Sequence, residues 1–199
     1  MTTRSWKIPN RLRGIWLFVF VVLFTGISMD ISAAGWKPTD TEAASKNDAD
    51  EQKVAQTIAN FKNHDPDLKL FFEKAYGYAV FPTVGKGGIV IGGAYGKGFV
   101  YEQGERIGKS SLTQLSIGFQ LGGQGYSEII FFKDHATLLD FTRGNFEFSA
   151  QASAVAVTAG ASSDAAYDKG VAVFTLAKGG LMYEASIGGQ KFNFKPMKP

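Results

Sequence analysis

The sequence predicts an α+β domain in which most of the chain forms a mainly antiparallel, glycine-rich β-sheet. Near the start of the domain, apolar residues recur every three to four positions, which is typical of an amphipathic helix. Beyond about residue 75 they alternate with polar residues, as in half-buried antiparallel strands, and most of the 24 glycines lie there. We expect about seven to nine strands in a sandwich or barrel-like arrangement, with an N-terminal helix and one or two short helices.

Three helices are expected along the chain. The first covers about residues 48–63, where Val54, Ile58 and Phe61 share one face. Asp65 and Pro66 then have the residue types of a helix N-cap and first helical position, which predicts a short helix ending near Ala75. A third helix is expected over residues 134–142, capped by Asp134 and presenting Leu138, Leu139 and Phe141.

Two long strands are expected on the basis of strict alternation. One covers Thr113 to Leu121 and places Leu115 and Phe119 on its buried face. The other covers Phe146 to Ala154 and buries Phe148. Shorter strands and the glycine-rich turns between them complete the sheet. The short strands are expected at 78–82, 88–94, 99–103, 127–133, 171–176 and 181–188, with turns at 85–87 and 178–180.

The first 34 residues resemble a secretory signal peptide. A basic start precedes an uncharged apolar run over residues 14–27. Crossing a bilayer requires about 20 apolar residues in a helix, so the shorter run favours a signal cleaved after about Ala34. An uncleaved membrane anchor is the alternative. Either reading predicts an exported protein, in the periplasm or associated with the envelope. The basic residues of this leader are Arg4, Lys7, Arg11 and Arg13.

Beyond the leader the chain is electrically neutral. The leader holds four basic residues and one acidic residue, which accounts for the whole formal charge of +3. The basic pI therefore does not indicate a nucleic-acid partner, and any basic surface must arise from local clustering. Residues 35–48 are small and polar and predict a flexible tether, followed by a single domain over residues 49–199.

No catalytic machinery is expected. The chain has no cysteine, which excludes disulfides, thiolate metal sites and a catalytic cysteine. Residues 104–110 resemble a phosphate-binding loop, but one residue is missing between the first glycine and Gly108-Lys109. His64 and His135 do not form a zinc-binding pattern, and no serine lies in a nucleophile-elbow motif. We expect a non-enzymatic protein without cofactor or metal.

Several glycine-containing segments, some of them with aromatic residues, follow one another along the chain, at residues 75–82, 84–88, 92–98, 122–124, 141–144 and 172–180. In this order they resemble the SYLF domain family. The resemblance covers about residues 50–194 and implies a lipid-binding domain, with phosphoinositide binding in eukaryotic members and actin binding and bundling in the yeast branch. Lipid binding in eukaryotic members is associated with a basic N-terminal helix, whereas residues 48–62 here are not basic. An exported protein also does not meet cytosolic actin filaments.

These observations predict an exported domain that binds lipid or an anionic membrane surface. The candidate lipid-binding residues are Lys86, Lys97, Arg106 and Lys109, which are expected at turns. A basic side chain near an anionic surface contributes about 1 kcal/mol. One alternative is a structural envelope protein, including an outer-membrane barrel. Another is a protein-binding or bundling module that resembles actin-binding proteins.

Overall fold

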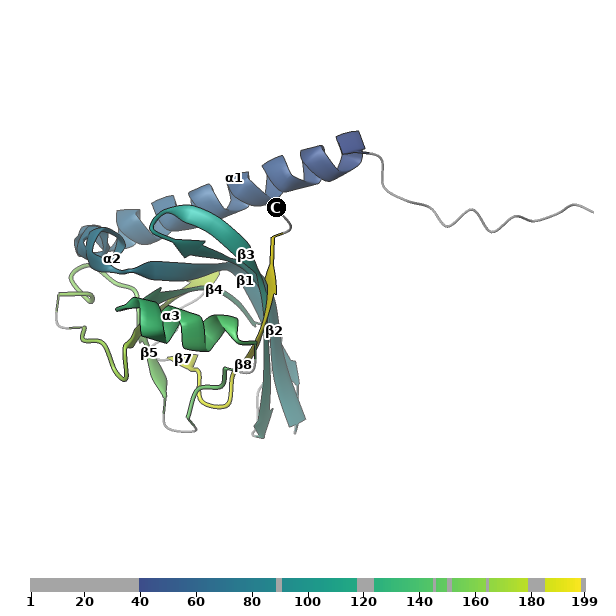
Figure 1. Ribbon diagram of the computed structural model, residues 1–199. Helices are drawn as coiled ribbons and strands as arrows, with labels where there is room; N and C mark the ends of the chain where they lie inside the picture. The colour runs from purple at the N-terminus through teal and green to yellow at the C-terminus, as the bar shows by residue number, and fades with distance from the viewer. Residues whose placement is uncertain are drawn as a thin grey trace, which may run out of the picture. The chain divides into compact units, whose positions relative to one another are not determined.

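A computed structural model describes residues 40–88, 91–117, 124–144, 146–149, 152–163, 165–178 and 185–197. These residues form a strongly curled sheet, with two helices on its outer side and one on its inner side (Figure 1). The helical elements are α1 (Asp40–His64), the 3-10 turn η1 (Pro66–Leu68), α2 (Lys69–Lys74) and α3 (His135–Thr142). The strands are β1 (Gly77–Gly88), β2 (Ile91–Glu102), β3 (Glu105–Ile117), β4 (Gln124–Phe132), β5 (Ser153–Ala156), β6 (Val171–Lys178), β7 (Ala185–Ser186) and β8 (Lys191–Pro196).

The second and third helices begin where their sequence signals predict. The backbone amide of Asp67 donates to the Asp65 side chain at 3.2 Å, which caps η1. The amide of Thr137 donates to Asp134 at 2.9 Å and caps α3 in the same way. The first helix begins at Asp40 rather than near residue 48, so the later part of the expected tether is helical. On α3, Leu138 and Phe141 are buried, but Leu139 is exposed.

The sheet has the strand order β7-β5-β6-β4-β1-β2-β3-β8. All neighbouring strands are antiparallel except β5 and β6, which are parallel. The chain is therefore an α+β domain with a mostly antiparallel sheet and an N-terminal helix, as predicted. The expected long strand from Phe146 to Ala154 is not continuous: residues 146–149 form an irregular segment with a single bridge at Glu147, and β5 follows at Ser153.

The curl brings the two ends of the sheet close together. The amide of Phe192, on edge strand β8, donates to Phe146 O at 2.9 Å. The amide of Phe148 donates to Gln190 O at 3.0 Å. The segment holding Phe146 and Phe148 leads into β5, near the opposite end of the strand order. These bonds satisfy backbone groups that an edge strand would leave unpaired.

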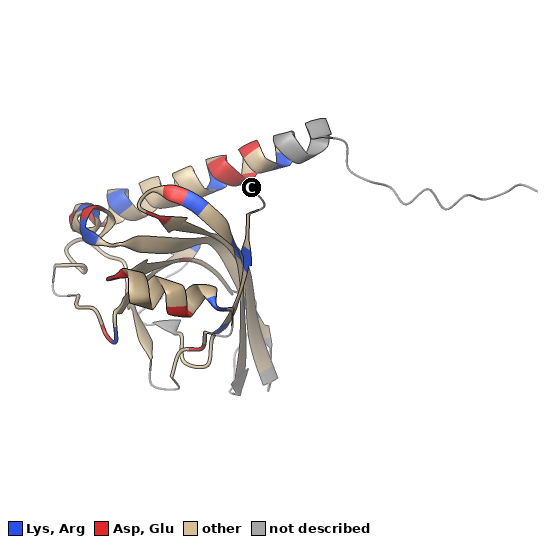
Figure 2. Ribbon diagram, in the orientation of Figure 1, with Lys and Arg blue, Asp and Glu red and all other residues tan. Residues whose placement is uncertain are grey.

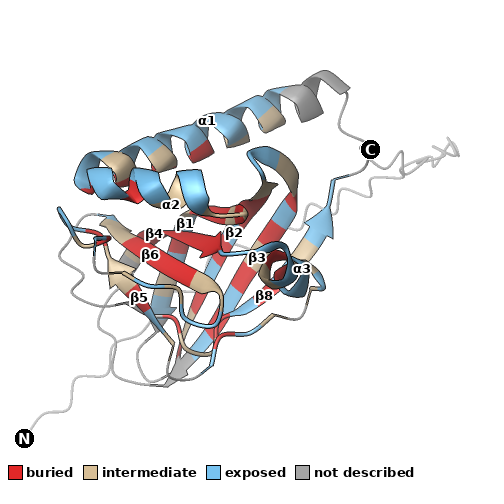
Figure 3. Ribbon diagram, turned by 60° about the vertical axis from the view of Figure 1, so that its left-hand side comes forward, coloured by how far each residue is buried: buried red, intermediate tan, exposed pale blue. Residues whose placement is uncertain are grey.

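Apolar side chains fill both sides of the sheet. The inner core contains Phe81, Phe132, Phe141 and Phe192, with Phe148 buried among them as predicted. The outer core lies between the sheet and the helices, and Val54 and Phe61 of α1 belong to it. Figure 3 shows this arrangement: the sheet beneath α1 is largely buried, while the far side of the helix is exposed. Val54 and Phe61 are therefore occupied in packing on the sheet.

Strand β3 buries the opposite face from the one predicted. Leu112 and Gln114 are buried, whereas Leu115 is 85% exposed. Gln114 is held inside because its Nε2 donates to Gly188 O at 2.9 Å. The prediction that Leu115 belongs to the core was wrong, because the alternation of buried and exposed residues in β3 is shifted by one residue. Phe119, which was predicted on the same face, lies outside the described residues.

The glycines expected to form a turn at 85–87 lie within a strand, since β1 continues to Gly88. Strand β2 likewise runs through Gly96 and Gly98. At Gly98 the reason is close packing: a Cβ there would lie 2.6 Å from both Val80 O and Phe81 Cδ1, beside an irregularity in the β1–β2 register. Glycine permits the two strands to approach at this point.

Candidate functional site

Two of the four predicted basic residues are engaged by α1. Arg106 Nη1 lies 3.4 Å from Glu51 Oε1, and Lys109 Nζ lies 3.9 Å from Asp50 Oδ2. Both cationic groups also lie over the ring of Phe99, at 5.3 Å and 5.6 Å from its centroid. Figure 2 shows the acidic and basic residues interleaved along α1 and the start of β3. The positive charge of this pair is therefore compensated within the domain.

The other two predicted residues lie on opposite faces of the sheet. Lys97 pairs in register with Ser111 and is exposed on the outer face. Lys86 pairs with Ala94, a residue of the inner core, and so belongs to the inner face. The four basic residues do not form one cluster. Their predicted position at turns was also wrong, because all four lie within strands β1, β2 and β3.

The outer face of the sheet is only partly covered by the helices. On β2, Phe99 lies in the outer core beneath them, while Lys97 and Tyr95, two and four residues earlier on the same face, are exposed. We call the uncovered part the open face. It consists of Thr83, Gly85, Gly87, Gly93, Tyr95, Lys97, Thr113, Leu115 and Lys178, which cross-strand register and exposure place together.

Two large, mainly apolar side chains on the open face are exposed to solvent. Leu115 is 85% exposed and Tyr95 is 51% exposed. Leu115 is opposite Gly93, and Tyr95 lies between Gly85 and Thr113, so glycines leave them little neighbouring side-chain cover. A Cβ at Gly85 or Gly87 would contact nothing within 4 Å.

Lysines flank this apolar pair. Lys97 is on β2, next to Tyr95 along the same face, and Lys178 Nζ donates to Thr83 Oγ1 at 2.6 Å. Within the described part of the chain, neither lysine has a carboxylate within 4.0 Å. Sequence reasoning identified Lys97 but missed Tyr95, Leu115 and Lys178. No local signal marks them, because the register that exposes them is set by cross-strand pairing.

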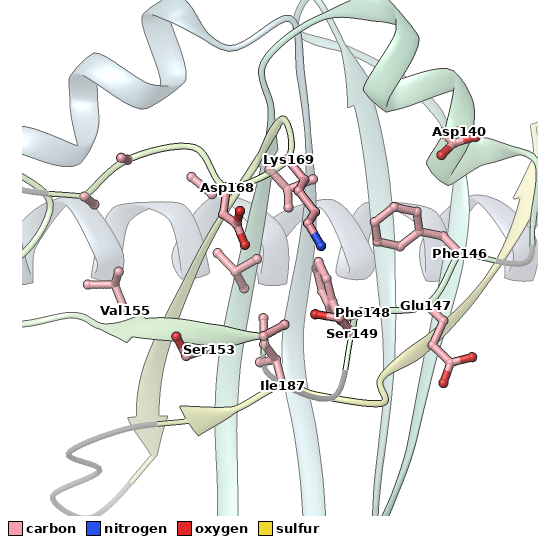
Figure 4. Close-up of a pocket in the computed structure, with 16 residues that line it drawn as sticks. Asp140, Phe146, Glu147, Phe148, Ser149, Ser153, Val155, Asp168, Lys169 and Ile187 are labelled. Atoms are coloured by element: carbon pink, nitrogen blue, oxygen red, sulfur yellow. The ribbon is translucent and has the colours of Figure 1, made fainter.

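A separate pocket of about 730 Å³ lies beside β5, β6 and the end of α3 (Figure 4). Its deeper lining includes the buried side chains of Phe148, Val173 and Ile187. Asp168 and Lys169 reach into it from the turn that precedes β6. Sequence reasoning did not find this pocket, because its walls come from segments that are distant along the chain.

The interior of the sheet also holds a buried polar cluster. Gln190 Nε2 donates to Glu128 Oε2 at 3.0 Å and to Tyr126 Oη at 3.1 Å. Burial raises the pKa of Glu128 to about 8, and the hydrogen bond from Gln190 opposes this shift. Burial also raises the pKa of Tyr126. At neutral pH the Glu128 carboxyl is therefore mainly protonated and the cluster is uncharged.

Two further findings concern only the described residues. They contain no group of three or more His, Asp or Glu side chains placed to hold a metal ion. Their helices are all too short or too polar to cross a membrane.

Comparison with known proteins shows which family the C-terminal half of the chain resembles. Residues 113–196 match the Ysc84 family model, described as "Las17-binding protein actin regulator". The chain is also 30% identical over 133 residues to the protein named "Beta cell expansion factor A" from Aeromonas veronii. That alignment covers 65% of this chain and 50% of the relative, so the chain spans about half the relative's length. Over residues 113–196 the chain is similar to the Ysc84, or SYLF, family, which confirms the resemblance seen in its sequence.

Proposed function

We propose that this protein is a non-enzymatic module that binds the surface of anionic membranes through its open face. The similarity of residues 113–196 to the Ysc84 family supports a lipid- or actin-binding type of domain. The observation that carries the membrane proposal is the exposure of Leu115 and Tyr95 beside Lys97 and Lys178. The leader supports a location in the cell envelope, where such a module would meet a membrane.

The open face has the chemistry of an interfacial surface. Transfer of a fully exposed leucine side chain out of water stabilises the bound state by about 2 kcal/mol. Tyrosine prefers the region of the lipid headgroups, because its ring is apolar and its hydroxyl stays hydrated. Each lysine near an anionic surface adds about 1 kcal/mol, and its aliphatic stem can pack along the lipid. Because Lys97 and Lys178 lack ion-pair partners in the described part of the chain, their charge is available to the membrane.

This proposal revises the set of residues expected to bind lipid. Lys97 remains, and Tyr95, Leu115 and Lys178 join it. Arg106 and Lys109 are less suitable, since Glu51 and Asp50 of α1 compensate their charges. The apolar side of α1 is unsuitable too, because Val54 and Phe61 are buried against the sheet.

The test is vesicle sedimentation with the chain from Gly35 onward, which omits the apolar leader. Wild-type protein should bind vesicles containing anionic phospholipid more tightly than neutral vesicles, and binding should weaken with salt as the screening length falls below about 10 Å. The double variant Leu115→Ser, Tyr95→Ser should lose about tenfold or more in affinity at every salt concentration. The double variant Lys97→Gln, Lys178→Gln should lose the salt dependence and the preference for anionic lipid.

Leu139→Ser is the matched control, because Leu139 is also an exposed leucine but lies on α3. It should bind like wild type. Wild-type affinity in both double variants would refute the role of the open face. Co-sedimentation with actin filaments, without binding to any vesicle, would instead support the protein-binding alternative that the family description suggests.

A further inference from the structure

The pocket beside β5 and β6 combines an apolar interior with a charged rim. Phe148, Val173 and Ile187 are buried in its wall, and Phe146, Val155 and Val171 add partly buried apolar surface. Its volume of about 730 Å³ is within the usual range for sites that hold small molecules. The interior therefore fits an apolar chain or ring.

Among the described residues, four charged side chains line the rim, and two of them have an ion-pair partner. Asp140 lies 3.5 Å from Arg143 Nη1, and Glu147 lies 3.4 Å from Lys191 Nζ. The remaining two, Asp168 and Lys169, have no ion-pair partner within 4.0 Å among the described residues.

The two uncompensated charges are held close together. Asp168 and Val171 exchange backbone hydrogen bonds of 2.8 Å and 3.0 Å across a two-residue turn. Lys169 and Gly170 form this turn with φ angles of 49° and 83°. Figure 4 shows the Asp168 and Lys169 side chains reaching from it into the same pocket. The rim thus presents one uncompensated carboxylate and one uncompensated ammonium group above an apolar interior.

We propose that this pocket binds a zwitterionic amphiphile, a molecule with an apolar body and a head that carries one anionic and one cationic group. The anionic group would contact Lys169, the cationic group would contact Asp168, and the apolar body would lie against Phe148 and Ile187. Single-chain phospholipids and free apolar amino acids both have this chemistry. The inference is independent of membrane binding, because the pocket and the open face share no residue.

The test is isothermal titration of the full chain with three single-chain probes below their micelle concentrations: a lysophosphatidylethanolamine, an alkyl phosphate and an alkylammonium of equal chain length. Free phenylalanine is titrated separately to distinguish the two sources. The zwitterionic probe should bind about fivefold more tightly than either the anionic or the cationic probe, which is the scale of one partly exposed ion pair. The same leader is present in every variant, so affinity ratios report the pocket.

Lys169→Asn removes the ammonium and keeps the turn, since Asn-Gly is favoured where both residues have positive φ. It should weaken the zwitterionic and anionic probes about fivefold and spare the cationic probe. Asp168→Asn should weaken the zwitterionic and cationic probes and spare the anionic probe. Ala166→Trp, an exposed position on the pocket lining, should weaken all three probes.

Two controls separate this site from other surfaces. Lys195→Gln removes an exposed lysine of β8 outside the pocket lining and should leave all affinities unchanged. The double variant Leu115→Ser, Tyr95→Ser should also bind the probes normally, even though it loses vesicle binding. Equal affinity for the three heads, binding unaffected by Ala166→Trp, or failure of every probe and of phenylalanine to bind would each overturn the proposal.

Discussion

A single buried carboxyl makes the stability of this domain depend on pH. Glu128 is fully buried inside the sheet, and burial raises its pKa from 4.5 to about 8. In the unfolded chain the carboxyl releases its proton above about pH 4.5, whereas the folded chain keeps it until about pH 8. The group therefore favours the unfolded state increasingly as pH rises through this window.

We expect Glu128→Gln to abolish this dependence, because glutamine has nearly the same shape and does not titrate. Between pH 4.5 and about 8, the wild-type protein should lose stability relative to the variant by up to about 1.4 kcal/mol per pH unit. Denaturant unfolding at closely spaced pH values measures the difference. Parallel stability curves for the two proteins would show that Glu128 is ionised in the folded state.

At the level of the strand, alternation identifies β3 but not the face that it buries. Leu112, Gln114 and Leu115 are all compatible with a half-buried strand, and the rule that apolar residues face the core selected Leu115. Pairing with β2 and β8, and the bond from Gln114 to Gly188 O, fix the opposite register. A shift of one residue exchanges the two faces of a strand.

Two leucines three positions apart test this register. Leu112→Ala should destabilise the domain by about 2–5 kcal/mol, because the side chain is fully buried. Leu115→Ala should change the stability by no more than about 0.5 kcal/mol, since its side chain is 85% exposed. Chemical denaturation gives both values in one series. Comparable losses for the two variants would mean that Leu115 is also buried in solution.

Helix starts were easier to predict than strand lengths, because glycine makes the ends of strands ambiguous in the sequence. Helix starts carry local signals, such as Asp65 and Asp134, whose side chains accept bonds from amides two or three residues later. Glycine-rich segments are ambiguous, because glycine permits both a turn and a close approach between strands. Gly98 has the second role, because atoms of Val80 and Phe81 on strand β1 lie too close for a Cβ at this position.

At the scale of the whole molecule, the candidate sites depend on contacts that no local pattern encodes. The compensation of Arg106 by Glu51 joins a strand to a helix more than fifty residues earlier. The pocket joins α3, the segment before β5, β6 and Ile187. The sequence correctly predicted a resemblance to the SYLF family. Of the four basic residues that it proposed for lipid binding, Lys97 lies on the open face. The open face and the pocket form only when the sheet has folded, because each is made of residues from distant segments of the chain.

One buried carboxylate stabilises the outer layer of the molecule, in which α1, η1 and α2 pack on the sheet. Asp65, at the junction of α1 and η1, is fully buried, and the amide of Ser162 donates to its Oδ2 at 2.7 Å. Its other oxygen accepts the capping bond from the amide of Asp67. The rings of Phe71 and Phe174, 4.8 Å apart, pack α2 on the sheet. Asp65 thus ties the helices to a loop ninety-seven residues away in the chain.

We expect Asp65→Ala to destabilise the domain by about 2–4 kcal/mol, because it removes a helix cap and leaves the buried amide of Ser162 without its acceptor. Asp67→Ala is the matched control: Asp67 is exposed, and its loss should cost less than about 1 kcal/mol. Hydrogen exchange distinguishes the mechanism. Asp65→Ala should increase exchange in η1 and around Ser162 more than in β1 and β4, since the inner core does not depend on this contact. Equal stability of the two variants would show that the outer layer is held by its apolar contacts alone.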